Sequence, residues 1–388
     1  MINEMKVGIV GFGGAGMAQL KHFESIKGCK VVSVFDTKKN GLERAERISS
    51  YLNLFDDFDA FLRSNIDAVA ICSPDRTHAE YMVKSIYAGK HTLCEKPLTD
   101  TIDGCRQVLK AEHENQQVVA SVQHQMRYLP VHMKMKELIK NGQLGKVSYL
   151  EGYYVHNLKT RASLYDTWRF EDNATPLVYS GCHFVDLLRW LIDDEVVQVM
   201  AMSNNLNFPE YPESDLNVVL LRFRSGVVGK VVVAFGAGRP QEHSVRIYGD
   251  NHCIENNLLF SKGGLSQIFC HPLFRMNPYR DVNIRNILSH VKWYAFARAF
   301  EFLMKNYNGP LEYFINSYPI RLYEHNLAVR ASILDFVESV RTGKKPQCTI
   351  NDAAKTVAVC LAGVESYRTG SPVELSKYGI SDIENDHN

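Results

Sequence analysis

The sequence lacks the features that mark secreted, membrane-spanning and nucleic-acid-binding proteins. Its nine cysteines are odd in number and include no C-x-x-C pair, which argues against a disulfide framework or a structural zinc site and favours a reducing cytoplasm. No stretch approaches the roughly 18 apolar residues that indicate a transmembrane helix, and the start of the chain shows no secretory signal. Basic residues (44) nearly balance acidic ones (43), so no net field steers the protein to nucleic acid or to an anionic membrane.

The chain is long enough for two domains. Its 388 residues, of which 45% are hydrophobic and 22% charged, have the composition of a globular protein too large for one ordinary core. The hydrophobic patterning changes near residue 127. We therefore predict one domain over residues 1–126 and a second over residues 127–388.

The first domain alternates short apolar runs with helical patterns. Near-continuous apolar strands between helices indicate a parallel sheet that is covered on both faces. We predict an α/β Rossmann domain with a doubly wound parallel sheet. Its expected strands are residues 6–11, 30–36, 67–72, 91–94 and 118–122, and its expected helices are residues 14–25, 77–88 and 101–115.

In the second domain, longer strands joined by short turns dominate. This pattern predicts an α+β domain with a large, mostly antiparallel open sheet, through which we expect the chain to form a homodimer or homotetramer. Its expected strands are residues 146–155, 196–202, 217–223, 227–234 and 243–248, and its expected helices are residues 130–140, 182–191, 326–341 and 352–369.

A G-x-G-x-x-G motif links the first strand to the first helix. Glycines at these spacings permit a tight turn, a close approach to a pyrophosphate and close helix–strand packing. Asp36 ends the next strand, where a carboxylate can bind the adenosine ribose and repel a 2′-phosphate. The cofactor is therefore expected to be NAD, although Lys38 and Lys39 keep NADP possible. The expected cofactor residues are Gly11, Phe12, Gly13, Gly14, Ala15, Gly16 and Asp36.

A more specific signal lies in residues 72–97, which contain the segments CSP, AGKH and EKP and a histidine at position 78. With residues 142–147, 180–191 and the ending at 343–373, they resemble the glucose–fructose oxidoreductase/inositol dehydrogenase (Gfo/Idh/MocA) family over nearly the whole chain. The resemblance implies that the lysine of EKP meets the substrate hydroxyl beside the nicotinamide. The residues that it adds to the cofactor site are Ser73, Pro74, His78, Glu95 and Lys96.

The chemistry of alcohol oxidation supports the same place for Lys96. The reaction needs a group that takes the hydroxyl proton and positive charge near the developing alkoxide. Lys96 follows a strand's carboxyl end, where open α/β sheets bind ligands. Glu95 is expected to orient neighbouring groups.

The family commonly shows D-x-x-x-H-x-x-D in the helix that faces the nicotinamide, and this chain has tyrosine in place of the first aspartate. The resemblance makes His183 a general acid/base, and an unperturbed imidazole pKa of about 6.5 suits that role. Asp186, one helical turn later, either orients this imidazole, contacts the substrate or pairs with Arg189. Tyr179 either donates to the substrate or shapes the pocket.

Three further features concern the substrate. Arg127 lies where family members often present an arginine to it, and Trp168 either stacks on a sugar ring or belongs to the core. The aromatic-rich residues 269–323 form either a lid or side wall that stacks on a carbohydrate, or an oligomer interface or additional core.

The sequence thus predicts an NAD-dependent dehydrogenase or reductase that acts on a secondary hydroxyl of a sugar, cyclitol or related polyol, without a metal. An NAD-retaining glycosidase with an oxidation–elimination mechanism is an alternative. A non-catalytic cofactor-binding regulator is a second one, against which the intact Lys96 and His183 argue.

Overall fold

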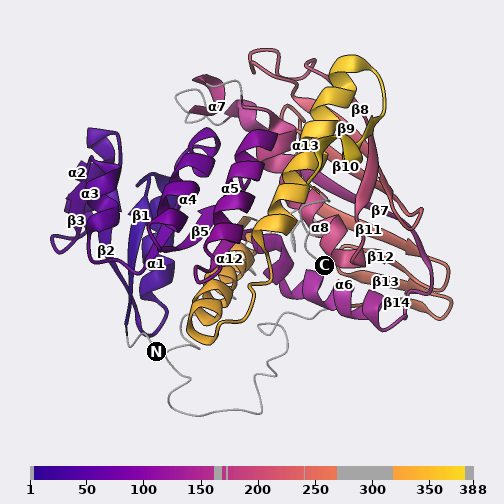
Figure 1. Ribbon diagram of the computed structural model, residues 1–388. Coiled ribbons are helices and arrows are strands. Elements are labelled where there is room, and N and C mark those ends of the chain that lie inside the picture. The colour runs from indigo at the N-terminus through magenta and orange to yellow at the C-terminus, as the bar shows by residue number, and fades with distance from the viewer. Residues whose placement is uncertain (1–3, 161–167, 172–173, 240, 269–317, 381–388) are drawn as a thin grey trace, which may run out of the picture.

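Two β-sheets, one in each half of the chain, organise the molecule (Figure 1). The computed structural model describes residues 4–160, 168–171, 174–239, 241–268 and 318–380. The first sheet lies at the left of Figure 1 and the second fans out at the right, with long helices between them. None of the helices in the described part of the chain combines the length and the apolarity that crossing a membrane requires.

The N-terminal sheet has six strands in the order β3-β2-β1-β4-β5-β6, and all neighbouring pairs are parallel. The strand order reverses between β1 and β4, and such a switch point is where open α/β sheets bind ligands. The strands are β1 (Met5–Val10), β2 (Cys29–Phe35), β3 (Asn53–Phe55), β4 (Ala68–Ile71), β5 (His91–Glu95) and β6 (Ala120–Gln123). The helices are α1 (Gly14–Glu24), α2 (Lys39–Ile48), α3 (Phe58–Arg63), α4 (His78–Tyr87) and α5 (Ile102–Glu114), with the 3₁₀ turns η1 (Asp75–Thr77) and η2 (Gln125–Tyr128).

The second sheet has nine strands in the order β14-β13-β12-β11-β7-β10-β9-β8-β15. All its neighbouring pairs are antiparallel except β7 with β10. Its strands are β7 (Val147–Val155), β8 (Val196–Asn204), β9 (Leu216–Phe223), β10 (Val228–Ala234), β11 (Glu242–Gly249), β12 (Cys253–Glu255), β13 (Leu258–Ser261), β14 (Gly264–Gln267) and β15 (Val373–Glu374). The remaining elements are α6 (Pro130–Lys140), η3 (Leu158–Thr160), α7 (Trp168–Glu171), the π-helical η5 (Leu177–Gly181), α8 (Cys182–Ile192), α12 (Tyr318–Thr342), α13 (Ile350–Thr369) and η7 (Leu375–Tyr378).

Helices α8 and α13 lie against this second sheet and against each other. Gly152 of β7 allows the close approach of α8, because a Cβ there would lie 2.4 Å from the ring of Phe184. Helix α13 begins with a capping box, in which the Thr349 hydroxyl accepts from the backbone N–H of Asp352 and the Asp352 carboxylate accepts from that of Thr349. This reciprocal cap fixes the start of α13 beside α8.

Helix α12 returns the chain to the N-terminal domain. Its buried residues Val329, Ile333 and Phe336 share a core with β1, β2 and α1. Their spacing of four and three residues places them on one helical face. Sequence residues 318–342 therefore help to complete the first domain, and the division at residues 126 and 127 stays a prediction.

The predicted fold class is confirmed. Most of the expected strands and helices lie within a few residues of their predicted ranges, whereas α12 begins at Tyr318 instead of residue 326. Gly226, with φ +90°, makes the expected turn between β9 and β10. Residues 39–63 form α2, β3 and α3, which the patterning did not predict because these elements are short or largely polar. The aromatic-rich stretch lies outside the described residues, apart from the backbone of the first turns of α12.

Candidate functional site

The carboxyl end of β5 meets the start of the second domain at Lys96. The Lys96 ammonium donates to the backbone carbonyl of Tyr179 in η5, with Nζ 2.8 Å from the oxygen. The peptide bond between Lys96 and Pro97 is cis. This hydrogen bond holds a cation from the N-terminal domain against the π-helical turn that precedes His183.

The glycine loop after β1 fits a dinucleotide. Gly11 has φ +81°, and a Cβ there would lie 2.9 Å from the backbone nitrogen of Ser73. A Cβ on Gly16 would lie 2.2 Å from the carbonyl oxygen of Gly11, so only glycine lets α1 pack this closely on the strand.

The start of α1 leaves room for phosphates. Its N-cap, Gly13, provides no side-chain cap, and a Cβ on Gly13 or Gly14 would meet nothing within 4 Å. The N–H groups of this first turn are therefore open to a pyrophosphate, whose charge the helix dipole favours. These residues fit the cofactor that the sequence predicts.

Asp36 lies beside that loop at the end of β2. Its two carboxylate oxygens accept from the backbone N–H groups of Phe12 and Lys38, each at 2.8 Å. These bonds orient an acceptor where an adenosine ribose would lie. Lys38 and Lys39 are exposed, and Lys39 Nζ lies 3.7 Å from Glu43.

His78 has a different role from the expected cofactor contact. The ring is fully buried, with Nε2 2.8 Å from the carbonyl oxygen of Ser73 and Nδ1 2.7 Å from that of Pro97. Both ring nitrogens therefore face backbone carbonyls. His78 links the loop that follows β4, including Ser73 and Pro74, to the segment that carries Lys96, so it positions the site.

Glu95 points to the other side of its strand from Lys96. Its carboxylate accepts from Gln19 of α1 at 3.2 Å, and Gln19 also contacts Gln123 of β6. Gln123 in turn donates to Ser332 of α12 at 2.9 Å. Glu95 thus belongs to a polar chain that ties α1, β6 and α12 together beneath the site.

His183 is in the first turn of α8 and only 6% of its surface is exposed. Its ring stacks on that of Tyr154, with the centroids 5.7 Å apart and the planes 7° from parallel, and its Nδ1 has no hydrogen-bond partner. Burial, followed by the nearby Lys96 charge, holds the pKa of His183 well below its usual value. The imidazole is therefore neutral at neutral pH and able to accept a proton.

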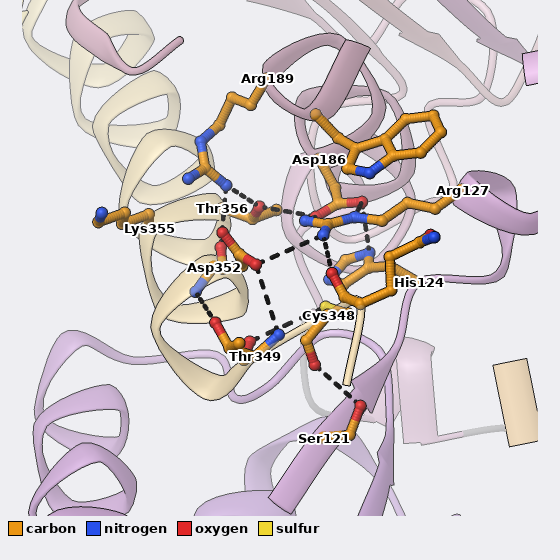
Figure 2. Close-up of polar contacts among 12 residues, drawn as sticks. Ser121, His124, Arg127, Asp186, Arg189, Cys348, Thr349, Asp352, Lys355 and Thr356 are labelled. Atoms are coloured by element: carbon orange, nitrogen blue, oxygen red, sulfur yellow. Dashed lines mark hydrogen bonds and ion pairs between the residues drawn. The ribbon is translucent and has the colours of Figure 1, made fainter. Parts of the chain in front are cut away.

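Asp186 neither orients His183 nor pairs with Arg189. Its two oxygens accept from Nε and Nη2 of Arg127, at 2.8 and 2.6 Å, in a fully buried bidentate ion pair (Figure 2). Burial alone would raise the pKa of Asp186, but Arg127 holds it below the usual value. Both residues are engaged in this pairing and Arg127 is only 2% exposed, so their expected substrate contacts stay predictions.

The same ion pair belongs to a wider network that joins the segment after β6 to α8 and to the start of α13 (Figure 2). Arg127 also donates to the carbonyl of Gln347, at 2.6 Å, and lies 3.4 Å from Asp352 in the cap of α13. Arg189 binds Glu195 and the hydroxyl of Thr356 of α13. The end of β6, helix α8 and the start of α13 are therefore fixed to one another.

His124 is a buried residue of this region that the sequence analysis missed. Both of its ring nitrogens lack a hydrogen-bond partner, and Nδ1 lies 3.7 Å from Asp186. Burial lowers the pKa of His124 to about 4. His124, Asp186 and Cys348 are close enough together to hold a metal ion, but Arg127 already occupies both carboxylate oxygens and burial raises the pKa of the Cys348 thiol. The group therefore fits a metal poorly.

Tyr179 holds Lys96 with its backbone carbonyl, and its side chain contacts Tyr211. Its hydroxyl lies 3.1 Å from that of Tyr211, which donates to the carbonyl of Ala174 at 2.7 Å. Burial raises the pKa of Tyr179 well above its usual value. The hydroxyl is thus engaged with neighbours of its own domain, and this contact favours the pocket-shaping role.

Trp168 packs beside Tyr179, with the ring centroids 6.2 Å apart and nearly perpendicular. The guanidinium of Arg169 lies over the Trp168 ring, 4.5 Å from its centroid. Arg169 and the buried Asp75 of η1 also escaped the sequence analysis. Neither lies in a motif, and their proximity to the site comes from chain segments that are far apart.

Comparisons with known proteins identify the family and the fold. Residues 5–124 match the "Oxidoreductase family, NAD-binding Rossmann fold", and residues 136–375 match the "Oxidoreductase family, C-terminal alpha/beta domain". An inositol 2-dehydrogenase of Rubrobacter xylanophilus is 30% identical over 256 residues, which are 64% of this chain and 70% of that protein. A scyllo-inositol 2-dehydrogenase (NAD(+)) of Bacillus subtilis is 26% identical over 97% of both chains.

A solved structure has the same fold. The scyllo-inositol dehydrogenase of Lactobacillus casei, solved with NAD(H) and scyllo-inositol, superposes with a TM-score of 0.74 at 18% identity, over 96% of this chain and 99% of that one.

We predict that the Asp36 carboxylate sets the cofactor preference. The protein is expected to bind NAD(H) more tightly than NADP(H). Asp36→Ser should reduce the ratio of these two affinities by roughly 10- to 100-fold, because a charged acceptor for the ribose is lost. Fluorescence titration of both reduced cofactors measures it, with Asp36→Asn as a control for the bond to Phe12 N. Tighter NADP(H) binding by the unmutated protein would instead assign the ribose site to Lys38 and Lys39.

A second prediction concerns the buried ion pair. Arg127→Met leaves the Asp186 carboxylate buried without its partner, so it should lower the free energy of unfolding by about 3–5 kcal/mol. Combining it with Asp186→Asn should recover part of that loss. Denaturant unfolding checks both, and Lys134→Met, which breaks an exposed ion pair with Glu137, should cost at most about 1 kcal/mol. Equal losses for Arg127→Met and Lys134→Met would contradict the structural role of the pair.

Proposed function

The chain belongs to the Gfo/Idh/MocA family of oxidoreductases, and from this premise we propose that it transfers a hydride between NAD and a secondary hydroxyl or ketone of a cyclitol or sugar. The names of its relatives, inositol 2-dehydrogenase and scyllo-inositol 2-dehydrogenase (NAD(+)), support this substrate class.

The observation that carries the proposal is the position of Lys96. The hydrogen bond to the Tyr179 carbonyl keeps its ammonium at the carboxyl end of β5. The same η5 turn leads directly into His183. A fixed cation and a neutral imidazole, one from each domain, are the groups that alcohol oxidation requires.

Each group has a separate task. Bound NAD supplies the hydride acceptor. Lys96 Nζ stabilises the negative charge that develops on the substrate oxygen, and the neutral His183 imidazole accepts the hydroxyl proton. In the reverse direction the imidazolium returns the proton to the oxygen. Tyr154, stacked on the His183 ring, holds the plane of that ring.

A different reaction would use many of the same residues. An NAD-retaining glycosidase oxidises and later re-reduces its substrate, so it releases a sugar without net NADH. Incubation with myo-inositol, scyllo-inositol and aryl glycosides therefore separates the two functions. Net absorbance at 340 nm from the inositols supports the dehydrogenase, whereas aryl alcohol release without NADH supports the glycosidase. Tight NAD(H) binding with neither activity would support a regulator.

We also propose that copies of the chain associate through the free face of the second sheet. Cross-strand partners place one row of side chains across six strands of this face. Four members are large, apolar and at least 40% exposed: Val228, Tyr248, Phe260 and Leu265. An exposed apolar row of this kind is typical of a protein interface.

The cysteines support a cytoplasmic location. All eight that lie among the described residues are free thiols, and most are buried. Unpaired buried thiols are typical of proteins that work in a reducing compartment.

The role of Lys96 predicts the result of its removal. Lys96→Met should lower kcat by about 10²–10⁴-fold, the range for losing one acid/base or charge-stabilising group, and leave the affinity for NADH within a few-fold. Steady-state NADH production and NADH titration measure these quantities. Lys110→Met, on the exposed face of α5, is the matched control. Normal turnover by Lys96→Met would make Lys96 structural.

The environment of His183 predicts the pH dependence. Because burial lowers the pKa of His183, the imidazole stays neutral down to a pH below about 6.5, and oxidation should decline only as the pH falls further. His183→Asn should lower kcat and abolish this acid limb in the pH profile of kcat/KM. His113→Asn, on an exposed part of α5, serves as the control. An acid limb that persists in His183→Asn would assign proton transfer to another group.

A further inference from the structure

Arg169 is an arginine at the site for which the mechanism has no use. It lies in α7, and its guanidinium carbon is 4.5 Å from the centroid of the Trp168 ring and 5.1 Å from that of Tyr179. The two rings are nearly perpendicular to each other. Contacts with two aromatic faces restrict where this guanidinium lies, because cation–π attraction favours the position over each ring.

The guanidinium has contacts with rings but none with an anion. Among the described residues, Arg169 makes no side-chain hydrogen bond or ion pair, although its side chain is partly buried. Arg127, Arg189 and Arg246 each bind at least one carboxylate. Arg169 therefore keeps five N–H donors in a planar fork, which matches a carboxylate or phosphate.

Its position is next to the reacting end of the site. Tyr179, whose ring contacts Arg169, is also the residue whose carbonyl oxygen accepts from Lys96 at 2.8 Å. Asp75, only 7% exposed, lies close enough to Lys96 and Arg169 for both charges to act on its carboxyl and oppose the rise of its pKa. The two cations therefore both lie near Asp75 of η1.

Three buried ionisable side chains lie near Arg169. Burial raises the pKa of the Asp75 carboxyl, against the opposing charges of His78, Lys96 and Arg169, which disfavours its ionised form. Burial also raises the pKa of Tyr179, and it raises that of Tyr211 to about 12, so both phenols are neutral. Lys96 and Arg169 thus lie near two neutral phenols and a carboxyl whose ionised form burial disfavours.

We propose that Arg169 is a specificity-determining residue that binds an anionic group of the substrate, a carboxylate or a phosphate, while Lys96 meets the hydroxyl that is oxidised. The preferred substrate is then an acidic sugar or polyol. This inference rests on the proposed function and narrows its substrate class. A bidentate contact with the planar guanidinium would also orient the reacting carbon.

The test compares probes that differ in one anionic group. Glucose, glucuronate and glucose 6-phosphate are offered with NAD⁺ to the full-length protein, with myo-inositol as a cyclic neutral polyol. An acidic probe should have a higher kcat/KM than glucose, and the better of the two acids identifies the group. Arg169→Met should lower kcat/KM for that acid by roughly 10- to 100-fold, the usual effect of losing a charged hydrogen-bonding partner, and leave glucose within a few-fold.

Two variants serve as controls. Arg169→Lys keeps the charge but loses the fork, so its loss with the acidic probe should be intermediate. Arg368→Met removes an exposed arginine that lies near an aromatic ring and pairs with Glu213, and it should leave the ratio of acidic to neutral substrates unchanged. The affinity for NADH should be the same in Arg169→Met, which separates substrate binding from a contact with cofactor phosphates.

A binding measurement keeps the inference testable without turnover. NADH fluorescence of the enzyme–NADH complex, titrated with glucuronate, glucose 6-phosphate and glucose, should show tighter binding of one acid, and Arg169→Met should abolish the difference. Equal binding of the three probes, or a preference that survives in Arg169→Met, would overturn the role of Arg169. Failure of every probe to reduce NAD⁺, with the binding preference intact, would overturn the proposed reaction and leave the anion site standing.

Discussion

The arrangement of the site depends on one buried ion pair, between Arg127 and Asp186. Arg127 follows the last strand of the Rossmann sheet, and Asp186 lies one turn after His183 in α8. The guanidinium also holds the chain just before α13 through the Gln347 carbonyl. The Arg127 guanidinium thus helps to fix the position of α8, and with it the His183 imidazole, relative to the sheet that carries Lys96. Burying two charges is costly in desolvation and adds little stability over an apolar pair. What this pair provides here is a bidentate geometry that an apolar contact between the same elements would not impose.

The parts of the site that could be predicted from the sequence are those formed by contiguous residues. The loop from Gly11 to Gly16 needs glycine for reasons that act within a few residues, and the structure shows those close approaches. Asp36 could be placed because it ends the strand that follows the loop, and Lys96 because it follows a strand of a parallel sheet. In each case local geometry and the known direction of strands are sufficient.

The partners of Asp186 and Tyr179 could not be predicted in the same way. Helical spacing offered His183 and Arg189 as neighbours of Asp186, yet its partner is 59 residues away in the sequence. A bidentate bond to a guanidinium outweighs a contact of one turn, which is worth only about 0.2–0.5 kcal/mol. For Tyr179, the prediction concerned the side chain, whereas in the structure it is the backbone carbonyl that accepts from Lys96. Every residue has a main-chain carbonyl that can accept a hydrogen bond, so the residue type does not indicate which carbonyl will bind a side chain. The unpartnered His124 became visible only when segments distant in sequence were brought together.

The catalytic groups of the proposed reaction are divided between two domains. This division explains why many polar side chains around them hold elements together instead of taking part in the reaction. Lys96 comes from the Rossmann sheet, whereas His183 and the carbonyl that holds Lys96 come from the second domain. The distance between Lys96 and His183 is therefore only as well defined as the contact between the two domains. Proton transfer from a substrate placed between these residues tolerates positional errors of only a fraction of an ångström. Three contacts of different kinds hold the elements around these groups: apolar packing of α12 on the first domain, the ion pair of Arg127 with α8, and the Glu95–Gln19–Gln123–Ser332 chain. The last of these begins at the residue next to Lys96 and ends on α12. The strand end that carries the lysine is thereby tied to the helix that joins the two halves of the chain.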